Sequence, residues 1–144
     1  MVDVERTFTV PKPVETVVEY LKDFARTESW DPGTVSCDRL DEGPVKVGST
    51  WRNVSEFRGK KTELAYELTR LEPGRLTFVG KNKTATSTDD LRFTAVGEGT
   101  SITYHAHIVF NGLAKLADPF LKREFEKLGD EVAVMMPDAF KAVD

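Results

Sequence analysis

The sequence is poor in the side chains that most metal and nucleophile chemistry needs. Its 144 residues include one cysteine, Cys37, and two histidines, His105 and His107. A single cysteine excludes an intrachain disulfide and a cysteine metal cluster, and two histidines leave a zinc site short of ligands. The histidines share one face of a predicted strand, which we place outside, with His107 beside Asp90. Cys37 is interpreted as a small core residue, and Ser/His or Cys/His catalysis has no base in the predicted interior.

Long apolar runs and a strong charge of either sign are missing too. No run approaches the ~18 residues of a membrane span, no signal-peptide pattern precedes the first strand, and no Gly-rich loop suits a phosphate group. Lys and Arg number 20 against 24 Asp and Glu, a net charge of −4, which argues against nucleic acid as a partner. The sequence therefore predicts one cytoplasmic domain over residues 1–144, with no stable membrane insertion, metal or other cofactor.

What the sequence does have is a series of strand patterns. Residues 2–10 alternate apolar and polar side chains, and Pro11-Lys12-Pro13 ends that strand. Two short helices are expected next, over residues 14–24 and 25–30. Further strands with short connections favour an antiparallel meander. These strands are expected over residues 35–40, 49–57, 61–71, 76–80, 84–96 and 100–110.

The last stretch of the chain reads as one long helix, from residue 112 to about 136. Its apolar residues recur at three- and four-residue spacing, and Pro137 is expected to kink or end it. Glu124 lies inside the apolar stripe, so its carboxylate must find a partner, reach water or take up a proton. The residues expected to be among the most buried on this helix are Phe120, Leu128, Val132 and Met135.

Pairing across the predicted hairpins indicates which side chains face this helix, because directly opposed residues share a face. A two-residue loop at Arg58-Gly59 places Trp51 opposite Tyr66 and Asn53 opposite Leu64. The inner face would then carry polar as well as aromatic groups, which is too much polarity for a dry core. We therefore predict a cavity between sheet and helix.

The hairpin before the long helix brings a carboxylate to the same face. A two-residue loop at Glu98-Gly99 pairs Tyr104 with Phe93, Ala106 with Leu91 and Ile108 with Asp89. Asp89 would then face inward, although a slip of one residue would turn it outward. The predicted inner face therefore carries Trp51, Asn53, Ser55, Tyr66, Tyr104 and Asp89.

Four stretches of the chain carry a resemblance to a known group of proteins. They read FTVPKPVETVVEYLKDFARTESWDPG, VKVGSTW, YELTRLEPGRLTFVG and GEGTSITYHAHIVFNG. In this order the chain resembles the START-like polyketide cyclase/dehydrase and lipid-transport superfamily. The resemblance implies an α+β helix-grip fold: a seven-stranded antiparallel sheet curled around a long C-terminal helix, with two short helices after the first strand. It also implies an elongated cavity. Members bind lipids, sterols, quinones or polyketides, and some cyclise and dehydrate poly-β-keto chains.

Three functions follow as hypotheses. The first is binding or transport of a hydrophobic small molecule, such as a lipid, quinone or polyketide, by a monomer or homodimer. The second is an aromatase/cyclase-type enzyme acting by enolisation and dehydration, with Glu124 or Asp89 as base and Tyr66 or Tyr104 holding an oxygen. The third is a regulatory or toxin–antitoxin-like protein that uses the fold as a partner surface.

Each candidate residue also has a purely structural interpretation. Glu124, the best catalytic candidate, is alternatively a carboxylate paired with Arg6 or Arg52. The aromatic residues are alternatively core packing, and Trp30-Asp31 either forms part of the cavity mouth or caps the core and starts a turn. The predicted ligand-binding residues are Trp30, Trp51, Asn53, Tyr66, Phe78, Asp89, Phe93, Tyr104, Ala106, Phe120, Glu124 and Leu128.

Overall fold

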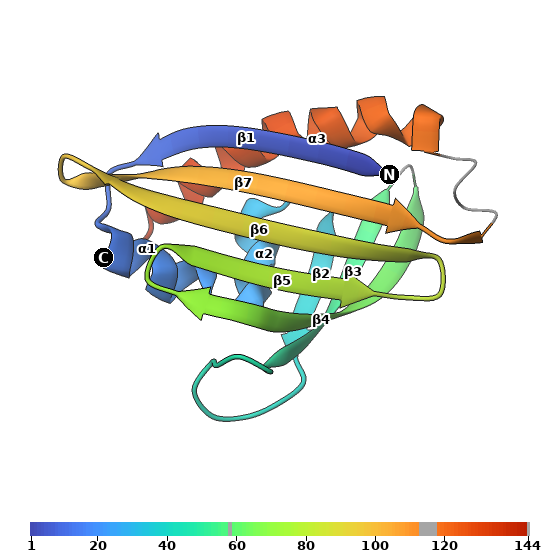
Figure 1. Cartoon of the computed structure of the whole chain (residues 1–144), viewed down its shortest axis with the longest axis horizontal. Helices are drawn as coiled ribbons and strands as arrows, with labels where there is room; N and C mark the ends of the chain where they lie inside the picture. The colour runs from blue at the N-terminus through green and yellow to red at the C-terminus, as the bar shows by residue number, and fades with distance from the viewer. Residues whose placement is uncertain (58, 113–117, 144) are drawn as a thin grey trace.

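The computed structural model describes residues 1–57, 59–112 and 118–143, with the side chains of residues 118–120 left aside. One curled sheet and one long helix make up most of the molecule (Figure 1). In chain order the elements are β1 (Val2–Val10), α1 (Val14–Leu21), the 3-10 turn η1 (Phe24–Arg26), α2 (Thr27–Trp30), β2 (Thr34–Arg39), β3 (Thr50–Phe57), β4 (Lys60–Glu72), β5 (Arg75–Lys81), β6 (Ala85–Val96), β7 (Gly99–Phe110) and α3 (Asp118–Phe140).

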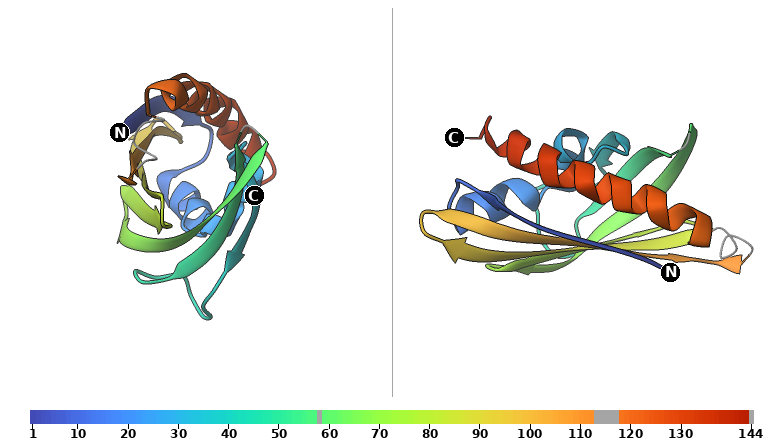
Figure 2. Two further views of the ribbon diagram at one scale, coloured as in Figure 1. Left: turned by 90° about the vertical axis from the view of Figure 1, so that its right-hand side faces the viewer. Right: turned by 90° about the horizontal axis from the view of Figure 1, so that it is seen from above.

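The sheet is antiparallel throughout, and its spatial order is β1-β7-β6-β5-β4-β3-β2. Strands adjacent in sequence are adjacent in space, except that β1 returns to pair with β7. Burial alternates along β1 from Val2 to Val10, as expected of a strand with one face inward. Figure 2 shows the sheet curled around the interior, with α3 lying across its open side. The predicted seven-stranded helix-grip fold is confirmed.

Of the two predicted hairpin registers, that of β3 and β4 is confirmed and that of β6 and β7 is shifted. Trp51 pairs with Tyr66 across β3 and β4, as expected. In the β6–β7 hairpin the turn is Gly97-Glu98 instead of Glu98-Gly99, and Asp89 pairs with Ala106 rather than with Ile108. Gly97 has φ 58°, the left-handed conformation that a tight two-residue hairpin turn requires at its first position. The register moved by two residues, so every side chain kept its predicted face.

The long helix α3 runs through Pro137 to Phe140, so the prediction that it would end near residue 136 is wrong. An internal proline costs about 3 kcal/mol. The last turn nevertheless buries Met136 and Phe140 completely, and the Phe140 ring lies 4.9 Å from that of Tyr20. Burying such side chains stabilises by about 1.5–3 kcal/mol each, which offsets the proline. The predicted start of the helix falls next to residues 113–117, which lie outside the described residues.

Burial along α3 also differs in part from expectation. Val132 is buried as predicted, whereas Leu128 and Met135 are only half-buried. The deeply buried positions shift to Met136 and Phe140 in the C-terminal half, and Leu128 faces an open space instead. In the described part of the chain, no helix combines the length and apolar character that crossing a membrane requires.

Arg6 ties α3 to the edge strand β1. Its guanidinium donates to the Glu126 carboxylate at 2.9 Å and to the Asp130 carboxylate at 2.9 Å. Arg52 pairs with Glu63 on the neighbouring strand. Both arginines therefore pair with carboxylates other than Glu124, so the structural alternative in which Glu124 pairs with Arg6 or Arg52 does not hold. Exposed ion pairs of this kind position a helix more than they stabilise it.

The interior divides into a packed half and an open half. The packed half lies under α1, η1 and α2, where the Phe24 ring is 4.3 Å from Tyr66 and 4.5 Å from Phe78 between centroids. The Trp51 indole donates to Asp23 at 3.0 Å. The large buried residues gathered here are Phe24, Trp30, Trp51, Leu68, Leu76, Phe78, Leu91, Ile102, Met136 and Phe140.

This division predicts unequal effects along α3. Met136→Ala removes a fully buried side chain and should lower the free energy of unfolding by about 2–5 kcal/mol. The matched control is Val134→Ala, which truncates a side chain that is 62% exposed and should change stability by less than ~0.5 kcal/mol. Urea unfolding followed by circular dichroism measures both. Equal losses in the two variants would mean that the C-terminal turns of α3 are not packed as described.

Candidate functional site

A cavity of about 620 Å³ occupies the open half of the interior, between the sheet and the N-terminal part of α3. This volume is in the range of small-molecule sites. Its apolar wall consists of Val4, Phe57, Leu64, Ala85, Ala106, Ile108, Phe110, Leu121, Phe125, Leu128 and Val132. Its polar wall consists chiefly of Asp31, Ser55, Thr62, Tyr66, Ser87, Asp89 and Tyr104.

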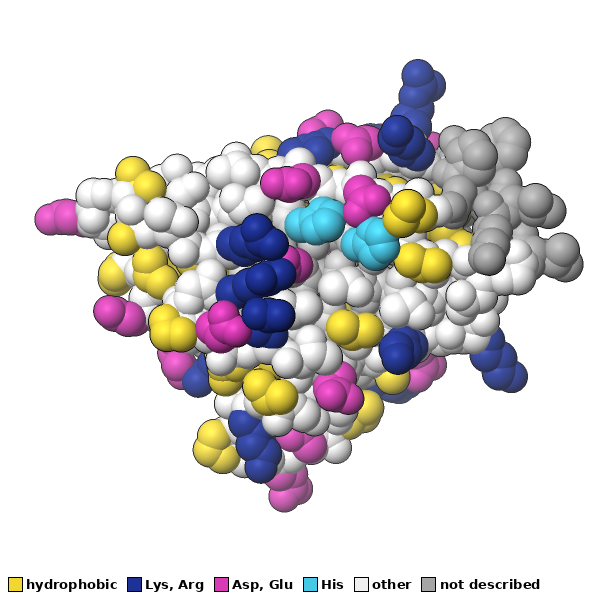
Figure 3. Space-filling model, in the orientation of Figure 1, with side chains coloured by type: hydrophobic (Ala, Val, Ile, Leu, Met, Phe, Trp, Pro, Cys, Tyr) yellow, Lys and Arg dark blue, Asp and Glu magenta, His cyan; other side chains and the backbone are white. Residues whose placement is uncertain are grey.

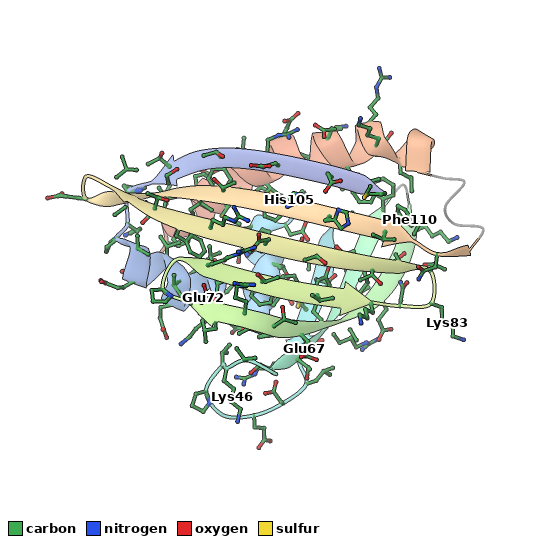
Figure 4. All side chains as sticks on the ribbon, viewed as in Figure 1. Lys46, Glu67, Glu72, Lys83, His105 and Phe110 are labelled. Carbon is green, nitrogen blue, oxygen red and sulfur yellow. The ribbon has the colours of Figure 1, made fainter. Side chains whose placement is uncertain are left out.

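The mouth lies at the end of the sheet where the β3–β4 and β5–β6 turns meet the end of β7. Lys60 at the start of β4, Thr84 in the β5–β6 turn and Phe110 at the end of β7 all line the space. Phe110 and Lys83 are labelled at this same end in Figure 4. The Phe57 ring stacks on Phe125 of α3 at 4.9 Å between centroids, so an aromatic pair joins β3 to the helix beside the opening.

Asp89 is a buried acid of the cavity wall. Asp89 pairs with Ala106 in the middle of the sheet, and the residue is 6% exposed. Burial raises its pKa to about 7, with a further contribution from the negative charge of Asp31, while hydrogen bonding to Tyr104 and Tyr66 acts in the opposite direction. The Tyr104 hydroxyl donates to the Asp89 carboxylate at 3.3 Å. Asp89 can therefore exchange a proton near neutral pH.

Asp31 is placed by the turn after α2. Its carboxylate accepts hydrogen bonds from the Gly33 backbone N–H at 3.0 Å and the Thr34 hydroxyl at 2.8 Å, an Asx-type turn. The Asn53 amide donates to the Thr34 hydroxyl at 3.2 Å and thereby supports the turn from behind. Burial raises the pKa of Asp31, against these hydrogen bonds. The sequence suggested either a turn or a cavity position for Asp31, and this residue occupies both.

Two tyrosines face Asp89. The Tyr66 ring lies flat on β5, where a Cβ at position 80 would come within 2.5 Å of it, so Gly80 is what admits the ring. Burial and the nearby Asp89 charge raise the pKa of Tyr66 and of Tyr104 well above the usual value. Both phenols therefore stay protonated, and each has one O–H to donate, either to Asp89 or to an oxygen of a bound molecule.

Nine of the twelve predicted ligand-binding residues fall into two groups. Those that line the cavity are Tyr66, Asp89, Tyr104, Ala106 and Leu128. Those buried in the hydrophobic core outside the lining are Trp30, Trp51, Phe78 and Phe93. The short helices fill the interior at their end of the sheet, which the pattern of inward residues alone does not reveal.

The remaining three predicted residues either lie outside the cavity lining or have a side chain outside the described residues. Asn53 is buried, and its amide bonds to protein groups, including the Ser55 hydroxyl at 2.6 Å. Glu124 is half-buried and is not part of the cavity wall among the described residues. The side chain of Phe120 lies outside the described residues.

Sequence reasoning missed Leu121 and Phe125 as cavity residues and left the place of Asp31 open. Leu121, Phe125 and Leu128 recur at helical spacing and line the wall together. Their spacing was therefore sufficient to predict that they share one face of the helix. For Asp31 the turn pattern Asp-Pro-Gly was visible, but the side on which the carboxylate lies depends on the long-range packing of α2.

The outer face of the sheet carries the histidines, away from the cavity. The rings of His105 and His107 contact one Asp3 carboxylate oxygen at 2.9 and 2.7 Å, so the expected partner Asp90 was wrong. Asp90 instead accepts two hydrogen bonds from Arg75. Figure 3 shows the histidines beside a row of basic side chains. Within residues 1–57, 59–112 and 118–143, no three His, Cys, Asp or Glu side chains are grouped as metal ligands.

Cys37 is buried in the core, as expected. Burial raises the pKa of its thiol to about 11, despite hydrogen bonding to Thr27 and Asn53. The thiol therefore stays protonated at neutral pH, and a protonated thiol is a poor nucleophile.

The raised pKa of Asp89 predicts a pH-dependent stability. The folded chain binds more protons than the unfolded chain between the ordinary value of 3.8 and about 7, so ionised Asp89 destabilises the fold increasingly as pH rises through that window. Asp89→Asn keeps the shape without the charge. Its advantage in unfolding free energy over the parent should grow by roughly 2–3 kcal/mol from about pH 5 to about pH 8, at ~1.4 kcal/mol per pKa unit.

Asp90→Asn, one residue away on the opposite face, is the matched control. Burial acts to raise the pKa of Asp90, but bonds from Arg75 and Thr77 lower it overall, so this carboxylate stabilises the fold above its unfolded pKa. The control should therefore lose stability at about pH 8 where Asp89→Asn gains it. Denaturant unfolding across the pH range measures both, and a flat difference for Asp89→Asn would show that Asp89 titrates normally.

Comparison with known proteins agrees with this geometry. Residues 1–135 match the family described as polyketide cyclase / dehydrase and lipid transport. A search of curated protein sequences finds no match.

Solved structures share the fold at low sequence identity. A protein of Thermus thermophilus superposes with a TM-score of 0.81 at 16% identity, over 97% of both chains. The Zhui aromatase/cyclase of a Streptomyces species gives 0.71 at 18% identity, over 95% of this chain and 89% of that one. A STAR-related lipid transfer protein of Xanthomonas axonopodis gives 0.73 at 10% identity, over 95% and 84%. By its match over residues 1–135, the chain belongs to the polyketide cyclase/dehydrase and lipid-transport family.

Proposed function

We propose that this protein binds or carries a hydrophobic small molecule in the cavity between sheet and α3. The observation that carries the proposal is the cavity itself, about 620 Å³ in volume, with an apolar wall on α3 and β7 and polar groups at Asp31 and Asp89. A ligand that buries its apolar surface there gains about 25 cal/mol per Å². The few polar groups would fix its orientation.

Filling the cavity tests this proposal. Ala106 lines the space opposite Asp89 and is 8% exposed, so Ala106→Trp should place an indole where the ligand would lie. Overpacking costs about 1–3 kcal/mol, which a stable fold can tolerate. Binding of a neutral apolar fluorophore, followed by its emission, should weaken at least about tenfold, a change of ~1.4 kcal/mol.

Val109→Trp is the control, because Val109 lies three residues along β7 on the outer face and is exposed. It adds the same indole without entering the cavity and should bind the fluorophore like the parent. If the parent binds no apolar fluorophore, the proposed function fails. If folded Ala106→Trp binds as well as the parent, the ligand lies elsewhere.

One observation favours an enzyme as the second candidate. Asp89 has a pKa of about 7, the range that suits a general base at neutral pH, and two protonated tyrosines face it. Such a site could remove a proton from carbon next to a ketone while a phenol holds the developing enolate oxygen.

Proton exchange tests this second function without knowledge of the natural substrate. Benzoylacetone, a small aryl β-diketone, is incubated with the protein in D₂O, and loss of its α-proton signal is followed by NMR. An enzyme should speed the exchange, and Asp89→Asn should lower the protein-dependent rate roughly 10²–10⁴-fold, whereas Asp90→Asn should not. Exchange no faster than in buffer would leave ligand binding as the function.

A further inference from the structure

The charged groups of the cavity wall are mostly acidic. Among the described lining residues, Asp31, Glu56 and Asp89 are acids, and Lys60 is the base. Glu56 and Lys60 are both exposed, near the β3–β4 turn at the mouth. The inner part of the wall therefore holds two carboxylates and, in the part of the chain that the structure describes, no cationic side chain.

The nearby arginines do not compensate these carboxylates. Arg6 donates to Glu126 and Asp130 on α3, and Arg75 lies on the outer face with Asp90. The α3 residues that face the cavity, Leu121, Phe125, Leu128 and Val132, are apolar. Among the described residues no cationic side chain acts on the Asp89 carboxylate, so a bound molecule could supply the positive charge that it lacks.

Asp89 is also short of hydrogen-bond donors. A carboxylate has about four acceptor sites, yet among the described residues Asp89 accepts one hydrogen bond within 3.5 Å, the 3.3 Å bond from Tyr104, beside a weaker interaction with the Tyr66 hydroxyl. The side chain is 6% exposed and lines the cavity, so its other lone pairs are open to that space. A buried carboxylate left in this state costs free energy unless a donor reaches it.

On the basis of the proposed function, we infer that the cavity selects hydrophobic molecules whose polar group is a hydrogen-bond donor, above all a protonated amine, and discriminates against carboxylates. An ammonium group would donate to Asp89 and gain from the negative charge of Asp31. A hydroxyl would donate without the charge attraction. A carboxylate would meet like charges and could bind only if it or Asp89 took up a proton.

Three ligands of one shape test the inference: naphthylethylamine, naphthylethanol and naphthylacetic acid. They share an apolar ring system and differ in the charge of the polar end. At about pH 8, where Asp89 is ionised, calorimetric titration should give the amine a dissociation constant about ten- to a hundredfold below that of the alcohol, the range of a hydrogen bond to a charged group. The acid should bind at least about tenfold more weakly than the alcohol.

Two further arms locate the effect. Asp89→Asn should reduce the preference for the amine to within about threefold of the alcohol, whereas Asp90→Asn, with the same charge change on the outer face, should keep it.

In the parent, lowering the pH to about 5.5 should reduce the preference as Asp89 takes up a proton. The titratable groups facing Asp89 are Asp31, Tyr66 and Tyr104. Both tyrosines stay protonated throughout, and protonation of Asp31 would act in the same direction. The pH arm needs no variant, so misfolding of Asp89→Asn does not leave the inference open.

The outcomes separate the two proposals. If naphthylacetic acid binds as tightly as the amine, or the preference survives Asp89→Asn and low pH, the inference is overturned and hydrophobic binding stands. If the neutral fluorophore binds but the amine does not displace it, the inference is again overturned. If none of the ligands and no apolar fluorophore binds, the proposed function itself fails.

Discussion

A single helix has to cover the inner face of a seven-stranded curled sheet, and that constraint shapes everything else. One α-helix with side chains is about 10–12 Å across, too narrow to fill the hollow by itself. At one end the short helices between β1 and β2 add Phe24 and Trp30 to the filling. At the other end nothing in the described residues fills the space beneath Leu121 and Leu128, and a cavity remains. The cavity is thus a consequence of where the extra helices sit.

The two consecutive acids of β6 show how this arrangement sets chemistry. Side chains alternate faces along a strand, so Asp89 points into the interior and Asp90 points outward. Arg75 and Thr77 lower the pKa of Asp90 even though burial opposes them. Burial and Asp31 raise the pKa of Asp89. The same residue type one position apart therefore stabilises the fold on one face and destabilises it on the other, a pattern typical of a functional position.

The buried Asp89 carboxylate destabilises the fold, and the fold does not require a polar side chain at this position. Its carboxylate accepts one 3.3 Å bond, whereas Asp31 accepts two shorter ones from its own turn. Tyr66 and Tyr104 provide protonated hydroxyls beside it, held by the Gly80 contact and by the pairing of β6 with β7. An apolar residue at position 89 would pack more simply. This unmet capacity for hydrogen bonds is what connects the fold to a bound molecule.

The sequence by itself determined what depends on neighbours along the chain: strand alternation, the order of elements and the side of the sheet on which Tyr66, Asp89 and Tyr104 lie. These follow from the two-residue period of a strand and from short turns. The turn was predicted one residue too late, at Glu98-Gly99, but this changes the pairing register by two residues and leaves every side chain on its predicted face. Only the tertiary structure decided that Trp51 and Phe78 belong to the packed core while Ala106 lines a cavity. It also decided that α3 continues beyond Pro137 and that Arg6 pairs with Glu126. Each of these depends on which distant side chains occupy the remaining space, and periodicity along the chain carries no information about that.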